Sequence, residues 1–224
     1  MMAKQTLPKP EGKSLPSQVY SCRVTYHPGS VLAGGFQYER RIEEDFKRMR
    51  TEVVEAPRNK LPPVVSGAMV GFDTEYDANA VLLTVGVADT KYAFAQETPF
   101  KEVKAVLKKA KVLCGHSITG DLDYLVRLGL ARDKWLRGLD VKDSFLLARM
   151  HDENRGKGGY GLETLLLSEV NAHGWKSVTD ALIKKTGNAA DWTPEQRVER
   201  CRMDAWATLL LTKLFEEKLE EQLL

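Results

Sequence analysis

The stretch AMVGFDTEY, residues 68–76, predicts a core strand of an α/β sheet and carries two acids near its end. Successive side chains of a strand point to opposite faces, so Gly71, Asp73 and Glu75 share one face while Val70, Phe72 and Thr74 take the other. Two adjacent carboxylates repel each other. Either this strand end reaches water, or a hard divalent cation offsets the repulsion, because oxygen ligands suit Mg²⁺. The pair alone leaves both interpretations open.

Strand and helix signals alternate after this stretch. Two further strands, AVLLTVGVAD (80–89) and KYAFA (91–95), are separated by turn-like residues, which predicts a β-meander. Residues 100–110 then show apolar side chains at helical spacing, and KVLCGH (111–116) predicts a short buried strand. A strand that follows a helix in this way pairs in parallel, so we expect an α/β fold with a mixed sheet flanked by helices.

The second half of the chain is mostly helical in pattern. We expect helices over 120–130, 142–150 and 161–170 and a brief strand over 138–141. Glycines in RGKGGYG (155–161) suggest a mobile connection. The final helix opens with Thr193 as its cap, Pro194 in the first turn and Gln196 three residues after the cap, a capping box.

Length and composition indicate one sizeable domain with an appended segment. Residues 66–224 carry the strand and helix pattern, whereas residues 1–65 hold seven of the nine prolines and predict a partly irregular N-terminal extension. The extension has 11 Lys and Arg against 7 Asp and Glu. This basic excess helps hold a polyanion, or it is an ordinary solvated surface; both interpretations stay open.

The sequence predicts a cytoplasmic protein, or a protein of the host cytoplasm if a phage encodes it. It has no long apolar run and no apolar signal-peptide core, so we expect no membrane partner. Its three cysteines, Cys22, Cys114 and Cys201, are far apart and predict reduced thiols.

Three more acids stand at telling positions. Asp121 and Asp123 begin the helix that follows a predicted buried strand, where acids also favour the helix dipole. Asp204 lies in the last helix among small and apolar neighbours. An unpaired buried carboxylate is costly, so Asp204 calls for a partner such as a metal ion.

Taken together, these acids resemble the DEDD superfamily of 3′–5′ exonucleases over residues 67–218. FDTE matches its first motif, and HSITGDLDYL matches its second, HNxxFDxxxL, through His116, Asp121 and Leu125. The segments VKDSFLLARM and YGLETLL are similar to further family segments. DWTPEQRVERCRMDAWATLLL resembles the third motif, with Asp204 as the fourth acid. The nearest likeness is to the proofreading domains of family A DNA polymerases, with ribonuclease D-like features.

The resemblance implies a ribonuclease H-like fold and phosphodiester hydrolysis with two Mg²⁺ or Mn²⁺ ions about 3.5–4 Å apart. By position, Asp73 would bridge both ions, and Glu75 and Asp204 would complete the site on the side of the attacking water. Asp121 would support the second ion through water. Asp123 falls outside the motif and is expected to face solvent.

The third motif departs from the family. The family has a Tyr four residues before its Asp, or a His five before it, to orient the attacking water; here these positions hold Arg200 and Glu199. A guanidinium stays protonated and cannot act as a base. Arg200 therefore pairs with an acid or contacts the scissile phosphate, or the bound hydroxide forms without a base, or Arg200 is a surface residue of a weakened enzyme. Arg200 and His116 are our candidates for binding substrate. For His116 the alternative is a structural role within the second motif.

Several other residues have two interpretations. Tyr160 is a substitute hydroxyl for the site or an ordinary loop aromatic. Trp192 and Trp206 stack on bases or pack in the core. Lys184 and Lys185 contact phosphates or solvate a helix end.

We therefore expect a metal-dependent exonuclease acting on single-stranded DNA or a primer 3′ end, in proofreading or in DNA replication and repair. The last helix resembles the linker to a polymerase, so a DNA polymerase subunit or domain is an expected partner. The alternatives are RNA trimming of the ribonuclease D kind, and a catalytically weakened domain that serves as a DNA-binding scaffold.

Overall fold

The computed structural model describes residues 54–63, 65–129, 138–156, 158–170, 172, 176 and 188–223, all within the compact unit Thr51–Leu224. The expected extension 1–65 lies outside these residues up to residue 53. None of the helices in this described part combines the length and the apolar character needed to cross a bilayer.

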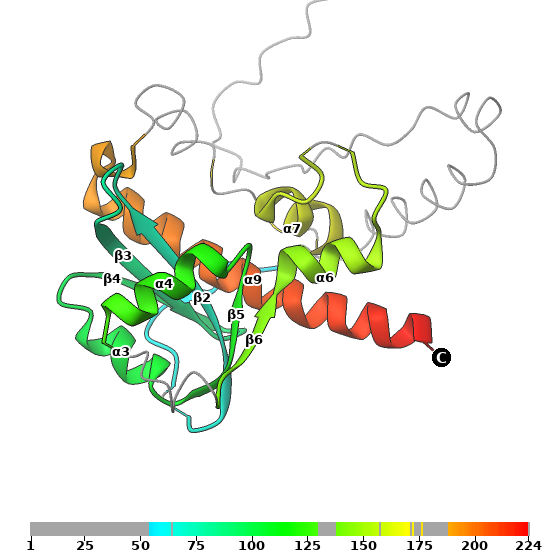
Figure 1. The fold of residues 1–224 in the computed structure, drawn as a ribbon, viewed down its shortest axis with the longest axis horizontal. Helices are drawn as coiled ribbons and strands as arrows, with labels where there is room; N and C mark the ends of the chain where they lie inside the picture. Colours follow the sequence, from blue (N-terminus) through cyan, green and yellow to red (C-terminus); the bar gives the residue numbers. More distant parts are fainter. Residues whose placement is uncertain are drawn as a thin grey trace, which may run out of the picture. The chain divides into compact units, whose positions relative to one another are not determined.

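The described residues form a six-stranded mixed sheet flanked by helices, as the sequence predicts (Figure 1). The strand order is β1-β4-β3-β2-β5-β6, and the bounds are β1 Arg58–Asn59, β2 Ala68–Tyr76, β3 Leu82–Ala88, β4 Tyr92–Glu97, β5 Ala110–Gly115 and β6 Asp140–Asp143. Strands β2, β3 and β4 form the predicted antiparallel meander, and β5 and β6 add in parallel beside β2. Strand β1, which the sequence does not predict, pairs in parallel with β4.

The helices of the described part follow the predicted order, with one added 3₁₀ turn before the last helix that the sequence does not predict. They are α3 Lys101–Leu107, α4 Thr119–Arg127, α6 Ser144–His151, α7 Leu162–Val170, the 3₁₀ turn η1 Ala189–Asp191 and α9 Pro194–Leu223. The predicted capping box is present at α9: Gln196 N–H donates to Thr193 Oγ1 at 3.3 Å, and Thr193 N–H donates to Gln196 Oε1 at 2.9 Å. Helix α4 ends at Arg127, three residues earlier than predicted, because Gly129 takes a positive φ of 66°.

Two apolar clusters lie on the two faces of the sheet. Val70, Phe72 and Leu113 pack with residues of α3 and α4 on one face. Helix α9 crosses β2, β3 and β4 on the other face and continues past the sheet beside α6 and α7 (Figure 1). Trp206 and Phe215 of α9 belong to the second cluster. Strand β2 is therefore central and has a helix layer on each side.

Helix α9 approaches the sheet closely because two strand positions have no side chain. A Cβ at Gly71 would lie 2.0 Å from the backbone oxygen of Ala205, and a Cβ at Gly86 would lie 2.5 Å from that of Cys201. These contacts are with backbone atoms, which cannot move aside as a flexible side chain can. Glycine at both positions brings the acid-bearing turn of α9 against the acid-bearing face of β2.

Candidate metal centre

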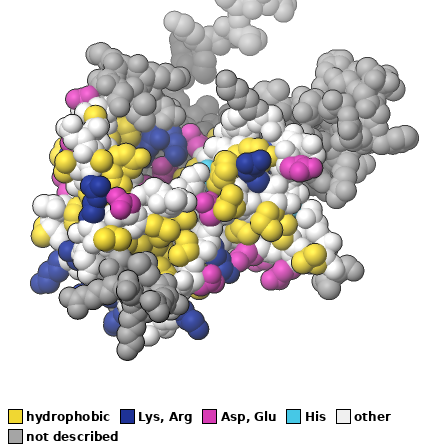
Figure 2. All heavy atoms as spheres, in the orientation of Figure 1, with side chains coloured by type: hydrophobic (Ala, Val, Ile, Leu, Met, Phe, Trp, Pro, Cys, Tyr) yellow, Lys and Arg dark blue, Asp and Glu magenta, His cyan; other side chains and the backbone are white. Residues whose placement is uncertain are grey.

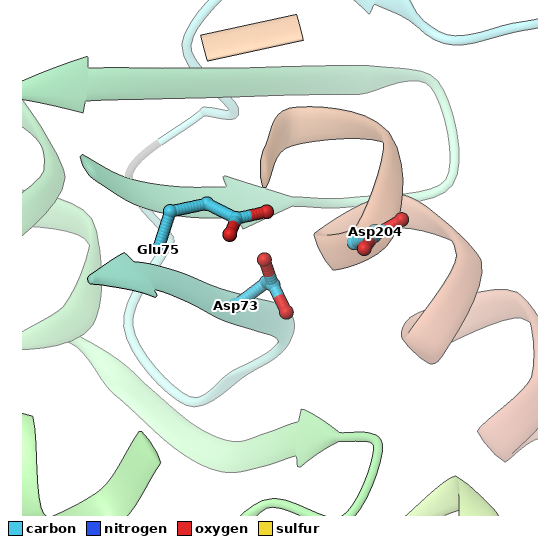
Figure 3. Close-up of side chains that lie close together, drawn as sticks. All are labelled: Asp73, Glu75 and Asp204. Atoms are coloured by element: carbon cyan, nitrogen blue, oxygen red, sulfur yellow. The ribbon is translucent and has the colours of Figure 1, made fainter. Parts of the chain in front are cut away.

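Three of the four predicted acids meet where α9 crosses β2. Asp73 and Glu75 project from β2 on the face that Gly71 opens, and Asp204 comes from α9 one residue before Ala205. One carboxylate oxygen from each lies within 4.8 Å of the other two. Figure 3 shows the three carboxyl groups directed into the same space between strand and helix. Residues 131 positions apart in the sequence thus form one oxygen-lined cluster.

Asp73 has a buried oxygen that nothing in the described structure satisfies. Its Oδ2 is buried and makes no hydrogen bond to any described residue. Its backbone carbonyl, in contrast, accepts a bond from the Cys201 thiol at 3.4 Å. Leaving a buried carboxylate oxygen without a donor is costly, and a cation at this point would remove the cost.

Burial and mutual repulsion disfavour ionisation of the two strand acids. Burial raises the pKa of Asp73 well above its usual value, and the charges of Asp204 and Glu75 raise it further. The pKa of Glu75 rises to about 8, first because of burial and then because of Asp204, although Arg200 and Lys176 oppose the rise. A divalent ion would reverse these shifts because it stabilises the ionised carboxylates.

Two basic side chains face the cluster. Lys176 Nζ lies 2.7 Å from Asp204 Oδ2. Arg200 Nε lies 3.5 Å from Glu75 Oε1 and 3.8 Å from Asp204 Oδ2. The Arg200 side chain is only 12% exposed, so its interpretation as a surface residue is wrong and its pairing with acids is confirmed.

The fourth acid, Asp121, stands apart from the other three. It lines the same cavity, but its carboxylate accepts a hydrogen bond from Thr74 Oγ1, whose side chain points to the opposite face of β2 from Asp73 and Glu75. Burial raises the pKa of Asp121 to about 6, against the lowering effect of its hydrogen bonds. The described residues therefore present a group of three carboxylates with Asp121 at its edge.

A cavity of about 370 Å³ opens over the carboxylates. Its lining includes Tyr76, His116 and Trp192 as well as the four acids and Arg200. The Arg200 guanidinium lies 5.1 Å from the Trp192 ring centroid, a cation–π contact. His116 Nδ1 is 3.0 Å from Ser144 Oγ, a contact that helps hold α6 beside the cavity. Burial lowers the pKa of His116.

The remaining candidates separate clearly. The Asp123 side chain is 66% exposed and pairs with Arg127 at 3.2 Å, as expected for a solvent-facing residue. Trp206 is buried in the second cluster, so its base-stacking interpretation is wrong. The Tyr160 hydroxyl donates to Asp152 O at 2.8 Å and holds its own loop. Lys184 and Lys185 lie outside the described residues.

Sequence reasoning missed two residues of the site. Lys176 sits in NAHGWKSV, where no periodicity marks a buried cation, and its role depends on a contact with α9 formed only in the fold. Tyr76 directly follows Glu75 and lines the cavity. Its position at the end of the acid-bearing strand is a signal that could have been used.

Carboxylate oxygens that converge in this way fit a hard divalent cation such as Mg²⁺ or Mn²⁺. Such a cation would also satisfy the buried Asp73 Oδ2, which has no hydrogen-bond partner among the described residues. The likeness to known proteins rests on the motifs alone. A search against models of protein families finds no match to the chain, and neither does a search of curated proteins.

Proposed function

We propose that this chain is a divalent-metal-dependent 3′–5′ exonuclease with a ribonuclease H-like fold, acting on the 3′ ends of single-stranded DNA. The observation that carries the proposal is the convergence of Asp73, Glu75 and Asp204 around a buried oxygen without a partner. The order of the acids along the chain, and the DEDD motifs around them, supply the reaction class and the direction of digestion.

The protein residues have distinct tasks in this reaction. Asp73, Glu75 and Asp204 would hold Mg²⁺ or Mn²⁺, with Asp121 at the edge of the site. Such ions lower the pKa of a bound water and offset charge on the phosphate. Arg200 keeps a fixed positive charge beside Glu75 and Asp204, and in this proposal it would pair with a phosphate oxygen of the substrate.

Recognition of the substrate is proposed to depend on the cavity itself. Figure 2 shows basic and acidic side chains interspersed over the described part of one face of the molecule, with hydrophobic side chains gathered between them. A surface of mixed charge attracts a polyanion only weakly. Tyr76, which is 48% exposed and lines the cavity, offers a ring on which any base can stack.

We place this activity in the cytoplasm, in proofreading or in DNA replication and repair, with a DNA polymerase subunit or domain as partner. This setting follows from the resemblance of the last helix to a polymerase linker. RNA trimming and a non-catalytic scaffold are alternative outcomes of the test below.

The test is digestion of 5′-labelled single-stranded DNA and RNA of one sequence, with Mg²⁺, Mn²⁺ or chelator. We expect a metal-dependent ladder on DNA that is lost in Asp73→Ala and kept in Asp123→Asn, which alters an exposed acid outside the cluster. A ladder on RNA alone would replace DNA with RNA as the substrate. No ladder with any metal would overturn the enzymatic proposal in favour of the scaffold.

A further inference from the structure

Lys176 is held firmly beside the acid cluster. Its backbone N–H donates to Glu163 Oε1 at 3.1 Å, which fixes its position against α7. Its ammonium lies 2.7 Å from Asp204 Oδ2, and its side chain is only 14% exposed. A buried lysine at this distance satisfies one carboxylate oxygen and brings a full positive charge into the cluster.

Arg200 adds a second positive charge on the same side. It reaches Asp204 Oδ2, the oxygen that Lys176 contacts, and also Glu75 Oε1. Among the described residues of the site, the three clustered carboxylates and Asp121 at their edge face these two cations, which leaves about two negative charges when all four acids are ionised. One divalent ion balances that charge, whereas two ions would leave an excess of positive charge among largely buried side chains.

The fourth carboxylate, Asp121, lines the same cavity, and its charge acts on Asp73 and Glu75 from the edge of the cluster. Asp121 is engaged by Thr74, which belongs to the opposite face of β2. Asp73 Oδ2, in contrast, is buried without a partner and lies in the group of three. The donors thus suit a single ion at Asp73, while Asp204 and Glu75 are shared with cations of the protein.

We propose that the free protein binds one divalent ion, at Asp73, and that Lys176 and Arg200 supply the positive charge of a second ion. This inference rests on the proposed function and changes its ion count. A second ion, which the family resemblance implies, would have to enter together with the substrate, whose phosphate brings negative charge.

The test is a titration of the metal-free full-length chain with Mn²⁺, followed by electron paramagnetic resonance of the unbound ion. We expect one Mn²⁺ per chain in the wild type. Lys176→Met keeps the length of the side chain and removes its charge, so we expect about tenfold tighter binding, or a second bound ion. Lys108→Met removes the same charge from an exposed position at the end of α3 and should bind as the wild type does.

The outcomes separate this inference from the proposed function. Two Mn²⁺ ions in the free wild type would overturn the inference and leave a metal-dependent nuclease in place. Unchanged affinity and ion count in a folded Lys176→Met, checked by circular dichroism, would also overturn it. No bound Mn²⁺ in the wild type would overturn both. If Lys176→Met does not fold, the wild-type ion count and Arg200→Met give the decision.

Discussion

Tyr76 is the aromatic residue best placed to meet a nucleotide. It ends β2 directly after Glu75, where the pairing of β2 with β3 shifts register. Its ring stacks on Tyr124 with centroids 5.1 Å apart, and Arg127 lies 5.1 Å from the Tyr124 centroid. The stack fixes the Tyr76 ring while leaving it half exposed at the cavity.

Replacing Tyr76 with Ala should therefore weaken substrate binding. Stacking of a base on an aromatic ring contributes about 1–3 kcal/mol, so we expect KM for single-stranded DNA to rise about tenfold with little change in kcat. Tyr76→Phe keeps the ring and should behave as the wild type. Equal KM values for the Ala and Phe variants would show that the base does not stack there. Steady-state kinetics on a short oligonucleotide distinguishes these results.

Residues that carry a local pattern could be predicted, and residues that act through the fold could not. Strand alternation places Asp73 and Glu75 on one face, and the small neighbours of Asp204 mark it as buried; the three acids do meet. Lys176 has no comparable signal. Thr74 engages Asp121 across β2, and that contact depends on the position of α4, which the sequence does not give.

At the scale of elements, the close contact between β2 and α9 sets the distance between the acids. Gly71 shares the face of Asp73 and Glu75, and the carbonyl of Ala205 occupies the space of its missing side chain. Any side chain at this position would push α9, and Asp204 with it, away from the sheet.

Gly71→Ala should lower stability by about 2–3 kcal/mol, because the new methyl group would overlap backbone atoms that have no alternative position. In a chain of this size, that corresponds to a Tm lower by about 5–10 °C in differential scanning calorimetry. Gly120→Ala is the matched control: a Cβ there meets no atom within 4 Å, and alanine favours the helix. A Tm of Gly71→Ala equal to that of the control would contradict the close packing described for α9.

Most elements of the fold follow from periodicity and capping. The meander, the parallel β5 and the α9 capping box all form as predicted, and the brief strand expected at 138–141 is present two residues later as β6. Strand β1 escaped prediction because two residues between prolines carry no alternation. It forms because β4 offers an unpaired edge to the passing chain.

At the scale of the whole molecule, the acid cluster opposes folding when no cation is bound. Glu75 has a pKa of about 8 in the folded chain against an ordinary 4.5, and burial and neighbouring charges shift Asp73 in the same direction. The folded state therefore keeps protons that the unfolded chain has released. Stability from these groups is greatest below about pH 4.5 and falls as the pH rises toward about 8.

The free energy of unfolding of the metal-free protein should consequently fall between about pH 5 and pH 8, at up to about 1.4 kcal/mol per pH unit for each proton retained. The Tm should fall with it over the same pH range. Millimolar Mg²⁺ should remove most of this slope because the bound ion stabilises the ionised carboxylates of the folded state. Glu75→Gln should show a smaller slope without metal. A Tm that rises over this window, or a slope unaffected by Mg²⁺, would contradict the buried, metal-free cluster.

The proposed activity depends on a divalent ion held by Asp73, Glu75 and Asp204. Anomalous diffraction from crystals of the chain grown with Mn²⁺ locates such an ion directly. We expect a peak between the three carboxylates, within about 2.0–2.3 Å of Asp73 Oδ2, and no peak there in Asp73→Asn crystals. Wild-type crystals with a refined structure but no peak at these carboxylates would contradict the metal centre.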